Sequence, residues 1–243
     1  MKGTPESVTQ RLDLRMPALV LLAAFLLEWL DADRAIARAL FYHPAAHGWI
    51  GTGPGDWWAR GLIHSAGRWL ARGVAVAALA CWGLTFVRPR LAPWRRQALF
   101  VFLGMVLVTA TVGLLKVLTD VDCPWDLSGF GGSRPYVTLF ADRPDYLPRA
   151  QCFPGAHSSS GFALMSFYFA LRNDSAGLAR IALGVALLVG TVFSIGQQAR
   201  GAHFLSHDLT SAALSWGILA TLHSRMFAVK TRAAPAVAEA TTG

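Results

Sequence analysis

The amino-acid sequence predicts an all-α fold, in which a polytopic membrane protein forms a bundle of six transmembrane helices. Three observations favour this fold class. Only 15% of the 243 residues are charged and 54% are hydrophobic, whereas an ordinary soluble domain carries about 25% charged residues. The hydrophobic residues are concentrated in runs of about twenty, the length that crosses a bilayer as a helix. Arginine-rich segments separate these runs, and six spans place all of them on one side of the membrane.

Six apolar runs are the predicted spans, and the third and the fifth are the clearest. Together they predict one membrane-embedded domain over residues 1–230, with its core at about residues 98–226. The small and polar segment 231–243 is predicted to be a disordered C-terminal tail. The six runs are Met16–Leu30, Leu70–Val87, Ala98–Thr119, Ser159–Leu171, Ala179–Gln197 and Asp208–Met226.

The positive-inside rule orients the predicted bundle. The segment RPRLAPWRR, which joins the second and third runs, carries four arginines. Basic residues also flank both ends of the bundle and the connection between the fourth and fifth runs. These segments and both termini are expected in the cytoplasm, so the segment 120–157 and the turn at 200–207 face outward. The formal charge of +8 belongs to this arginine-rich side, and no soluble basic face predicts a nucleic-acid partner.

A long outward segment, residues 31–69, joins the first and second runs. Its tryptophans suit anchoring at the membrane interface, and part of it is expected to form a helix in the interface plane. No cleavable signal peptide is expected, because the first run is followed by EWLDADRA and not by a small-residue cleavage site. The tryptophans are Trp49, Trp57, Trp58 and Trp69.

Three polar clusters fall at the predicted outer face. Lys116 lies near the outer end of the third run, His157 opens the fourth in CFPGAHSS, and His203 precedes the sixth in RGAHFLSHD. A lysine this deep in an apolar run normally faces the bundle interior or a water-filled cavity. Two histidines with cations suit a phosphate, because one imidazole attacks phosphorus, the other transfers protons, and the cations offset negative charge. Backbone N–H groups at the start of the fourth run would add an anion site.

These clusters resemble the motifs of the type 2 phosphatidic acid phosphatase superfamily, which are K-x6-R-P, P-S-G-H and S-R-x5-H-x3-D. The first motif reads KVLTDVDCP here, with Lys116 and Pro124 matching and Cys123 in place of the arginine. The second reads PGAH, with Gly155 in place of serine and Ala156 in place of glycine, before the matching histidine.

The third motif lies in QQARGAHFLSHD, where His203 matches. Gln197 stands at the arginine position, six residues before the histidine, and Arg200 lies three residues before it. His207 stands at the aspartate position, and Asp208 follows one residue later. The resemblance covers the order, spacing and membrane setting of all three motifs, from residue 116 to residue 208.

The resemblance implies a six-span, metal-independent phosphatase without a cofactor, which works through a phosphohistidine. His203 would be the nucleophile and His157 the general acid and then the base. Asp208, or more weakly His207, would orient His203. Arg200 would replace the shifted arginine of the third motif, Arg134 or no residue would replace that of the first, and a serine hydroxyl would replace the one missing at position 155. The implied substrate-binding residues are Lys116, Arg200, Arg134, Gly155, Ser158 and Ser159.

Two cysteines, Cys123 and Cys152, lie in the outward segment. They could form a disulfide if this segment meets an oxidising compartment, and otherwise they are two unpaired thiols. Set against the three motifs, a disulfide would join the loop of the first motif to the second. It would hold the phosphate site in place without a direct chemical role.

The leading hypothesis is a phosphatase that hydrolyses a lipid phosphate or diphosphate at the periplasmic face of a bacterial inner membrane. Undecaprenyl pyrophosphate, phosphatidylglycerol phosphate, phosphatidic acid and the lipid A phosphates are candidate substrates. A lipid phosphotransferase would use the same histidine. A non-catalytic scaffold or transporter is a further alternative, although transporters place their sites near the middle of the bilayer. A zinc site on His203 and His207, together with His157 and Asp208, is the last, and the neighbouring cations Lys116 and Arg200 disfavour it.

Overall fold

Helices occupy all six apolar runs in the computed structural model, which describes residues 14–227. Within these residues, three segments are long and apolar enough to cross a membrane, namely Trp57–Val87, Pro89–Asp126 and Ala176–Ala199. The predicted tail at 231–243 lies outside the described residues, and the count of six spans stays a prediction. The helices of the six runs are α1 (Arg15–Trp29), α3 (Gly67–Val87), α4 (Arg95–Thr119), α5 (Ala156–Phe162) with α6 (Met165–Leu171), α7 (Ala176–Ala199) and α8 (Leu205–Phe227).

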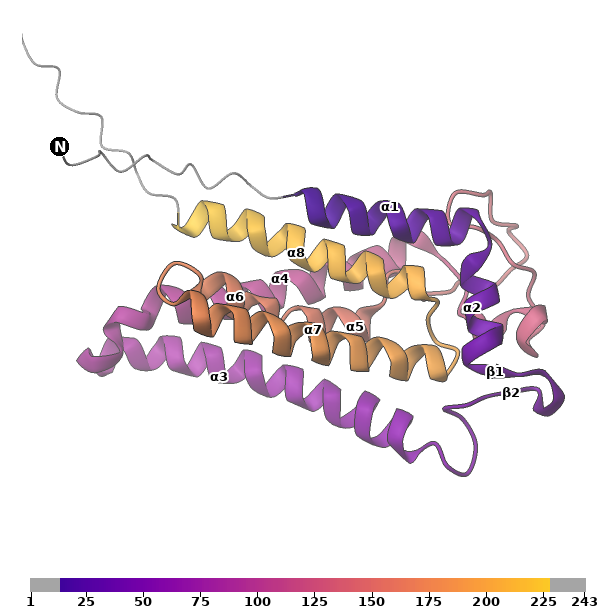
Figure 1. Cartoon of the computed structure of the whole chain (residues 1–243), viewed down its shortest axis with the longest axis horizontal. Helices are drawn as coiled ribbons and strands as arrows, with labels where there is room; N and C mark the ends of the chain where they lie inside the picture. Colours follow the sequence, from indigo (N-terminus) through magenta and orange to yellow (C-terminus); the bar gives the residue numbers. More distant parts are fainter. Residues whose placement is uncertain (1–13, 228–243) are drawn as a thin grey trace, which may run out of the picture.

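The long helices run along one axis, and the connections gather at its two ends (Figure 1). One end, which we call the loop end, holds α2 (Ala32–Leu40), the hairpin of β1 (Tyr42–His43) and β2 (Gly48–Trp49), and the segment 120–155. The opposite end, called the turn end, holds the arginine-rich connection from α3 to α4, the connection from α6 to α7 and the end of α8. The arginine-rich segments therefore lie together, as the positive-inside rule requires.

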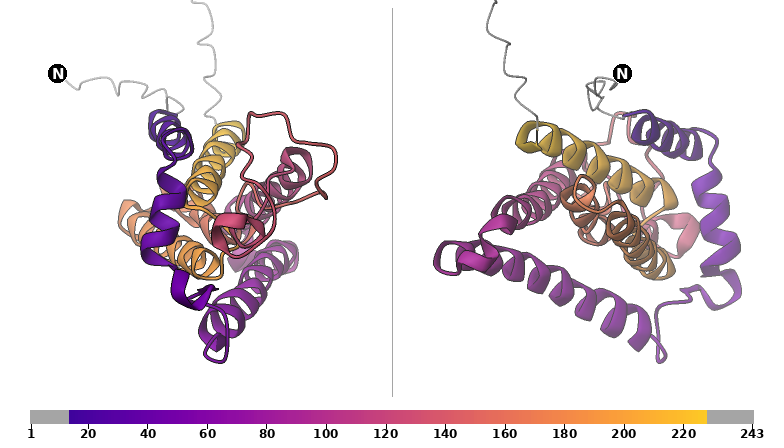
Figure 2. Two further views of the ribbon diagram at one scale, coloured as in Figure 1. Left: turned by 90° about the vertical axis from the view of Figure 1, so that its right-hand side faces the viewer. Right: turned by 60° about the vertical axis from the view of Figure 1, so that its left-hand side comes forward.

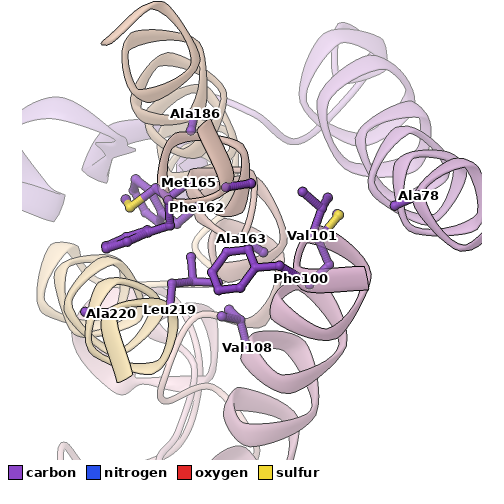
Figure 3. Packing of buried hydrophobic residues seen from close by; sticks show 13 residues of the cluster. Ala78, Phe100, Val101, Val108, Phe162, Ala163, Met165, Ala186, Leu219 and Ala220 are labelled. Atoms are coloured by element: carbon purple, nitrogen blue, oxygen red, sulfur yellow. The ribbon is translucent and has the colours of Figure 1, made fainter. Parts of the chain in front are cut away.

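A hydrophobic core joins α4, α5, α6 and α8, with α3 and α7 beside it (Figure 3). Phe100 and Val108 of α4 and Leu219 of α8 are fully buried in it. Elsewhere many large apolar side chains on α1, α3, α4 and α7 are exposed, which suits a surface covered by lipid. The helix α1 packs along α8 at the edge of the bundle (Figure 2).

The structure corrects three expectations about helix limits and the outward loop. The second run is helical from Trp57, because a π-helical segment (Trp57–Ala66) leads directly into α3. The fourth run is two helices, since 3₁₀-type bonds such as that from the Leu164 N–H to the Gly161 carbonyl tighten the chain between α5 and α6. Trp49, expected as an interfacial anchor, is instead buried in an aromatic cluster, whereas Trp57 and Trp69 are exposed.

Candidate active site

His203 and Asp208 form a buried pair at the loop end. His203 lies in the turn after α7, and Asp208 lies in the first turn of α8. Nδ1 of His203 is 2.8 Å from Oδ1 of Asp208, with the two side chains 4% and 2% exposed. The other carboxylate oxygen accepts a hydrogen bond of 2.9 Å from the Gln198 amide. The carboxylate holds the imidazole proton on Nδ1, so Nε2 of His203 keeps a free lone pair.

His207, the other candidate for orienting His203, is placed differently. Its ring centroid lies 6.1 Å from that of His203, and its ring packs edge-on against Phe153 and Phe204. Its backbone carbonyl accepts a hydrogen bond of 3.1 Å from the Gly155 N–H. The structure therefore pairs His203 with Asp208 and uses His207 to pack the two motifs together.

The turn that carries His203 is held by the loops around it. Gly201 has a φ of +72° and lies against the indole of Trp49, where a side chain would collide with the ring. The Gly201 carbonyl accepts a hydrogen bond of 2.9 Å from the Trp125 N–H, and the Ala199 carbonyl accepts one of 2.8 Å from Gly51. The hairpin and the segment after α4 thus fix the position of this turn.

His157 lies in the first turn of α5 and is packed between two rings. It stacks on Phe193 of α7 with centroids 4.4 Å apart, and the ring of His64 lies 4.8 Å away. Its Nε2 is 3.1 Å from the backbone carbonyl of Ile63. Because a carbonyl only accepts, Nε2 carries the proton and Nδ1 is the nitrogen left for proton transfer.

Gly155 lies directly against the His203–Asp208 pair. A side-chain carbon at this position would lie 2.6 Å from Oδ1 of Asp208 and 2.8 Å from Nδ1 of His203. The backbone of Gly155 has ordinary extended angles, so the requirement for glycine is one of space. The residues Ser158 and Ser159 are also buried here, and their hydroxyls donate to the carbonyls of Gly155 and Ala156.

Two of the predicted phosphate-binding cations lie on elements that border this site. Lys116, in the last turn of α4, lies close enough to Asp208 for their charges to interact. Arg200 donates a hydrogen bond of 3.2 Å to Oε1 of Gln197. The amide nitrogen of Gln197 is in turn 2.9 Å from Nδ1 of His64. A chain of polar contacts therefore joins Arg200 to His64, whose ring lies tilted against that of the candidate acid, His157.

Arg134 is engaged within its own loop. Its guanidinium lies 2.5 Å from a carboxylate oxygen of Asp122 and 3.7 Å from one of Asp126, so contact with a phosphate would require these ion pairs to open. The same loop contains the disulfide between Cys123 and Cys152, whose Cα atoms are 5.1 Å apart. This bond ties the end of the first motif to the segment that leads into the second.

The start of α8 is capped by a residue from a distant part of the chain. Oδ1 of Asp33, in α2, accepts a hydrogen bond of 3.0 Å from the Ser206 N–H. Burial raises the pKa of Asp33 to about 6, so the carboxyl group is ionised at neutral pH. A negative charge at a helix N-terminus is favourable, and this one holds the helix that carries Asp208.

Histidine, cysteine, aspartate and glutamate side chains of residues 14–227 form no group of three or more arranged to hold a metal ion. Asp208 is directed at Nδ1 of His203 and is shared with Gln198. The geometry of this region therefore gives no support to the zinc alternative.

Comparison with known proteins places this site in a family. The PAP2 superfamily model matches residues 97–230, more than half of the 243-residue chain. The chain belongs to the PAP2 superfamily. The match contains all three motif regions, and membership supports a phosphatase. No curated protein matches the chain.

A solved structure shares the fold of this PAP2 chain. It is described as the first transmembrane PAP2 type phosphatidylglycerolphosphate phosphatase from Bacillus subtilis. The similarity has a TM-score of 0.52 at 19% sequence identity, and it covers 89% of this chain and 98% of the other. The architecture is thus that of a membrane PAP2 protein.

Two departures from the PAP2 motifs explain each other. The third-motif aspartate is displaced by one residue to Asp208, and its Oδ1 occupies the space beside Cα of Gly155. A serine at position 155, as in the superfamily pattern, would place its Cβ in that space. The glycine in the second motif is therefore the counterpart of the displaced aspartate in the third.

Sequence reasoning missed two residues of this site, His64 and Gln198. His64 was assigned to the outward loop because the helix was expected to begin at Leu70, whereas the π-helical segment places it beside His157. Gln198 falls at a position of the third motif that the superfamily pattern leaves unspecified. A polar amide at the end of an apolar run was the available signal.

We expect Gly155→Ser, which restores the superfamily letter, to lower the rate of phosphate release by about 100-fold. The new Cβ displaces Asp208 or His203 by a large part of an ångström, and such misplacement costs about that factor. Gly217→Ser in α8 is the control, because a side chain there meets open space. Equal rates in both variants, measured on purified protein of matched thermal stability, would contradict the steric explanation.

Proposed function

We propose that this PAP2 protein is a phosphatase that hydrolyses a lipid phosphate or lipid diphosphate through a phosphohistidine on His203. One observation carries the proposal, the hydrogen bond of 2.8 Å between Nδ1 of His203 and Oδ1 of Asp208. This bond fixes the tautomer that leaves Nε2 as a nucleophile.

The proposed reaction has two steps. Nε2 of His203 attacks phosphorus, and the bond from phosphorus to the lipid oxygen breaks while Nδ1 of protonated His157 gives that oxygen its proton. His157 then removes a proton from a water molecule, whose oxygen attacks the phosphohistidine. The phosphorus–nitrogen bond breaks, its electron pair returns to His203, and inorganic phosphate leaves.

The charges around the histidines suit this reaction without a metal ion. Lys116 and Arg200 offset the charge that develops on the phosphoryl oxygens. Asp208 stabilises the positive charge that His203 gains when it is phosphorylated. We assign the phosphate-binding role to these two cations, with Arg134 bracing the loop through Asp122.

The proposed location is the periplasmic face of a bacterial inner membrane, with both termini in the cytoplasm. Support comes from the separation of features along the bundle, since the arginine-rich connections lie at the turn end and the disulfide at the loop end. The apolar surface of the bundle and the printed description of the structural neighbour favour a substrate with a lipid tail.

The test is phosphate release by the purified protein in detergent from phosphatidic acid, phosphatidylglycerol phosphate and a prenyl diphosphate. We expect release from at least one lipid, unchanged by EDTA and inhibited by vanadate, which mimics a trigonal-bipyramidal phosphoryl group. Loss of release in EDTA, with recovery on addition of a divalent ion, would contradict the proposed mechanism. Transfer of phosphate to an added alcohol in place of water would favour the phosphotransferase.

A further inference from the structure

A cavity of about 340 Å³ opens beside the candidate acid, between α3, α4 and α5. His64 and His157 line this cavity together with Arg68 and Arg72 of α3. Met105 and Val106 of α4 give the opposite wall an apolar surface. The cavity therefore extends from the candidate acid, His157, to a region of α3 that carries two positive charges.

The two arginines of this cavity belong to α3 and have no carboxylate partner in the part of the chain that the structure describes. They lie four residues apart in α3, so they share one face of the helix. Among residues 14–227, no carboxylate forms an ion pair with either arginine, whereas the nearby Arg60 is paired with Asp56 at 3.1 Å. Arg72 packs over the ring of Trp69 with 5.1 Å to its centroid, and the charge of Arg68 acts on His64.

The spacing along the helix separates these arginines from the phosphate that reacts. His64 contacts His157, Arg68 follows His64 by four residues, and Arg72 follows by eight. Each α-helical turn advances about 5.4 Å, so the backbone positions of Arg68 and Arg72 lie about one and two turns along the helix from that of His64. A phosphate bound at His203 would leave this pair free for a second anion, and paired guanidinium groups suit phosphate oxygens.

We propose that Arg68 and Arg72 bind the second, non-reacting phosphate of a lipid that carries two. The second phosphate is either bonded directly to the first, as in a diphosphate, or linked to it through glycerol. The apolar wall at Met105 and Val106 would receive the start of the lipid tail. This inference rests on the proposed function, and it selects two-phosphate lipids over monophosphate lipids as substrates.

The test compares the double variant R68Q/R72Q with the wild type on three lipids, namely phosphatidic acid, a prenyl diphosphate and phosphatidylglycerol phosphate. We expect kcat/KM to fall by about 10- to 100-fold, mainly through KM, for at least one of the two-phosphate lipids. For phosphatidic acid the change should stay within about threefold, because its single phosphate does not reach the arginines. The lipid with the larger loss identifies which linkage between the phosphates the site accepts.

The matched control is R88Q/R90Q, which removes two exposed arginines at the turn end. It should leave kcat/KM unchanged for all three lipids. An equal loss for phosphatidic acid and the two-phosphate lipids in R68Q/R72Q would overturn the proposal in favour of general phosphate attraction. No loss for any lipid would overturn it in favour of arginines that only reach toward the membrane surface.

A binding measurement separates this inference from the proposed function. Lipid analogues with one phosphonate or with a methylene diphosphonate are titrated by microscale thermophoresis, which needs no turnover. The wild type should bind the diphosphonate about tenfold more tightly than the monophosphonate, and R68Q/R72Q should lose that preference. Absence of the preference in the wild type would refute the second-phosphate site even if the protein hydrolyses lipids. Its presence without any hydrolysis would uphold the site and refute the function.

Discussion

His203→Ala is expected to lower phosphate release from the preferred lipid by at least about 10⁴-fold, which leaves only the background of an assembled but inert site. The variant removes the nitrogen that forms the bond to phosphorus, and no neighbouring side chain offers a nucleophile at the same position. Binding should persist, because Lys116 and Arg200 remain. Phosphate release measures the loss, and binding of a non-hydrolysable phosphonate lipid measures what remains.

The chemistry of this variant is tested by trapping the intermediate. The protein is mixed with a substrate whose phosphate carries an isotopic label. Because phosphohistidine is hydrolysed in acid, the reaction is stopped in base, the protein is digested, and the labelled peptide is identified by mass spectrometry. We expect the label on the peptide that contains His203, and we expect His157→Gln to slow its removal by water. His43→Ala, an exposed histidine at the same end, is the control. Label on His157 would mean that the two histidines have each other's roles. Label on a serine would contradict a phosphohistidine intermediate.

Asp208→Asn is expected to cost about 10²- to 10⁴-fold in turnover while the protein stays folded. The Gln198 amide donates to one oxygen of residue 208, so an asparagine would turn its carbonyl toward Gln198 and its NH₂ toward His203. Nδ1 of His203 would then have to accept, which moves the imidazole proton to Nε2 and blocks attack. The effect follows from the wrong tautomer and not from lost packing.

A matched control exists at the turn end, where Oδ2 of Asp174 accepts a hydrogen bond of 2.9 Å from the Gln97 amide. Asp174→Asn makes the same chemical change in the same type of pair, and its turnover should equal that of the wild type. Asp208→Glu should recover part of the lost rate, because it restores an acceptor at Nδ1. Full activity of Asp208→Asn would mean that His207 or another group orients the nucleophile.

Sequence alone could predict a bundle of membrane helices, because such helices are recognised as apolar runs of about twenty residues. It could also predict that Lys116, His157 and His203 lie at helix ends, since their order and spacing follow the family motifs, and their roles stay predictions. The limits of the second helix were wrong, because a polar π-helical segment with two tryptophans does not read as part of an apolar span. Trp49 was misjudged for a related reason, as a tryptophan suits a membrane interface and an aromatic cluster equally well.

The finer details of the site depend on distances that a linear sequence does not contain. In the sequence, the displacement of Asp208 by one residue is only a departure from the third motif. The structure explains this departure, because Asp208 lies directly against Gly155. Gln198 becomes relevant only when the end of α7 meets the start of α8. His64 lies 93 positions before His157 in the sequence and contacts it only in the folded protein. Arg68 and Arg72 lie on the same helical segment and reach the same cavity.

The residues that match the PAP2 family and the residues that hold the site in place are not the same set, as the cap of Asp33 on α8 shows. The PAP2 match begins at residue 97, yet a carboxylate from α2 holds the helix that carries Asp208, and the hairpin clasps the turn of His203. A chimera that joined residues 97–230 to the first third of another relative would inherit every motif letter. It would lack the carboxylate of Asp33 and the contacts of the hairpin, so the position of the site depends on residues outside the family match.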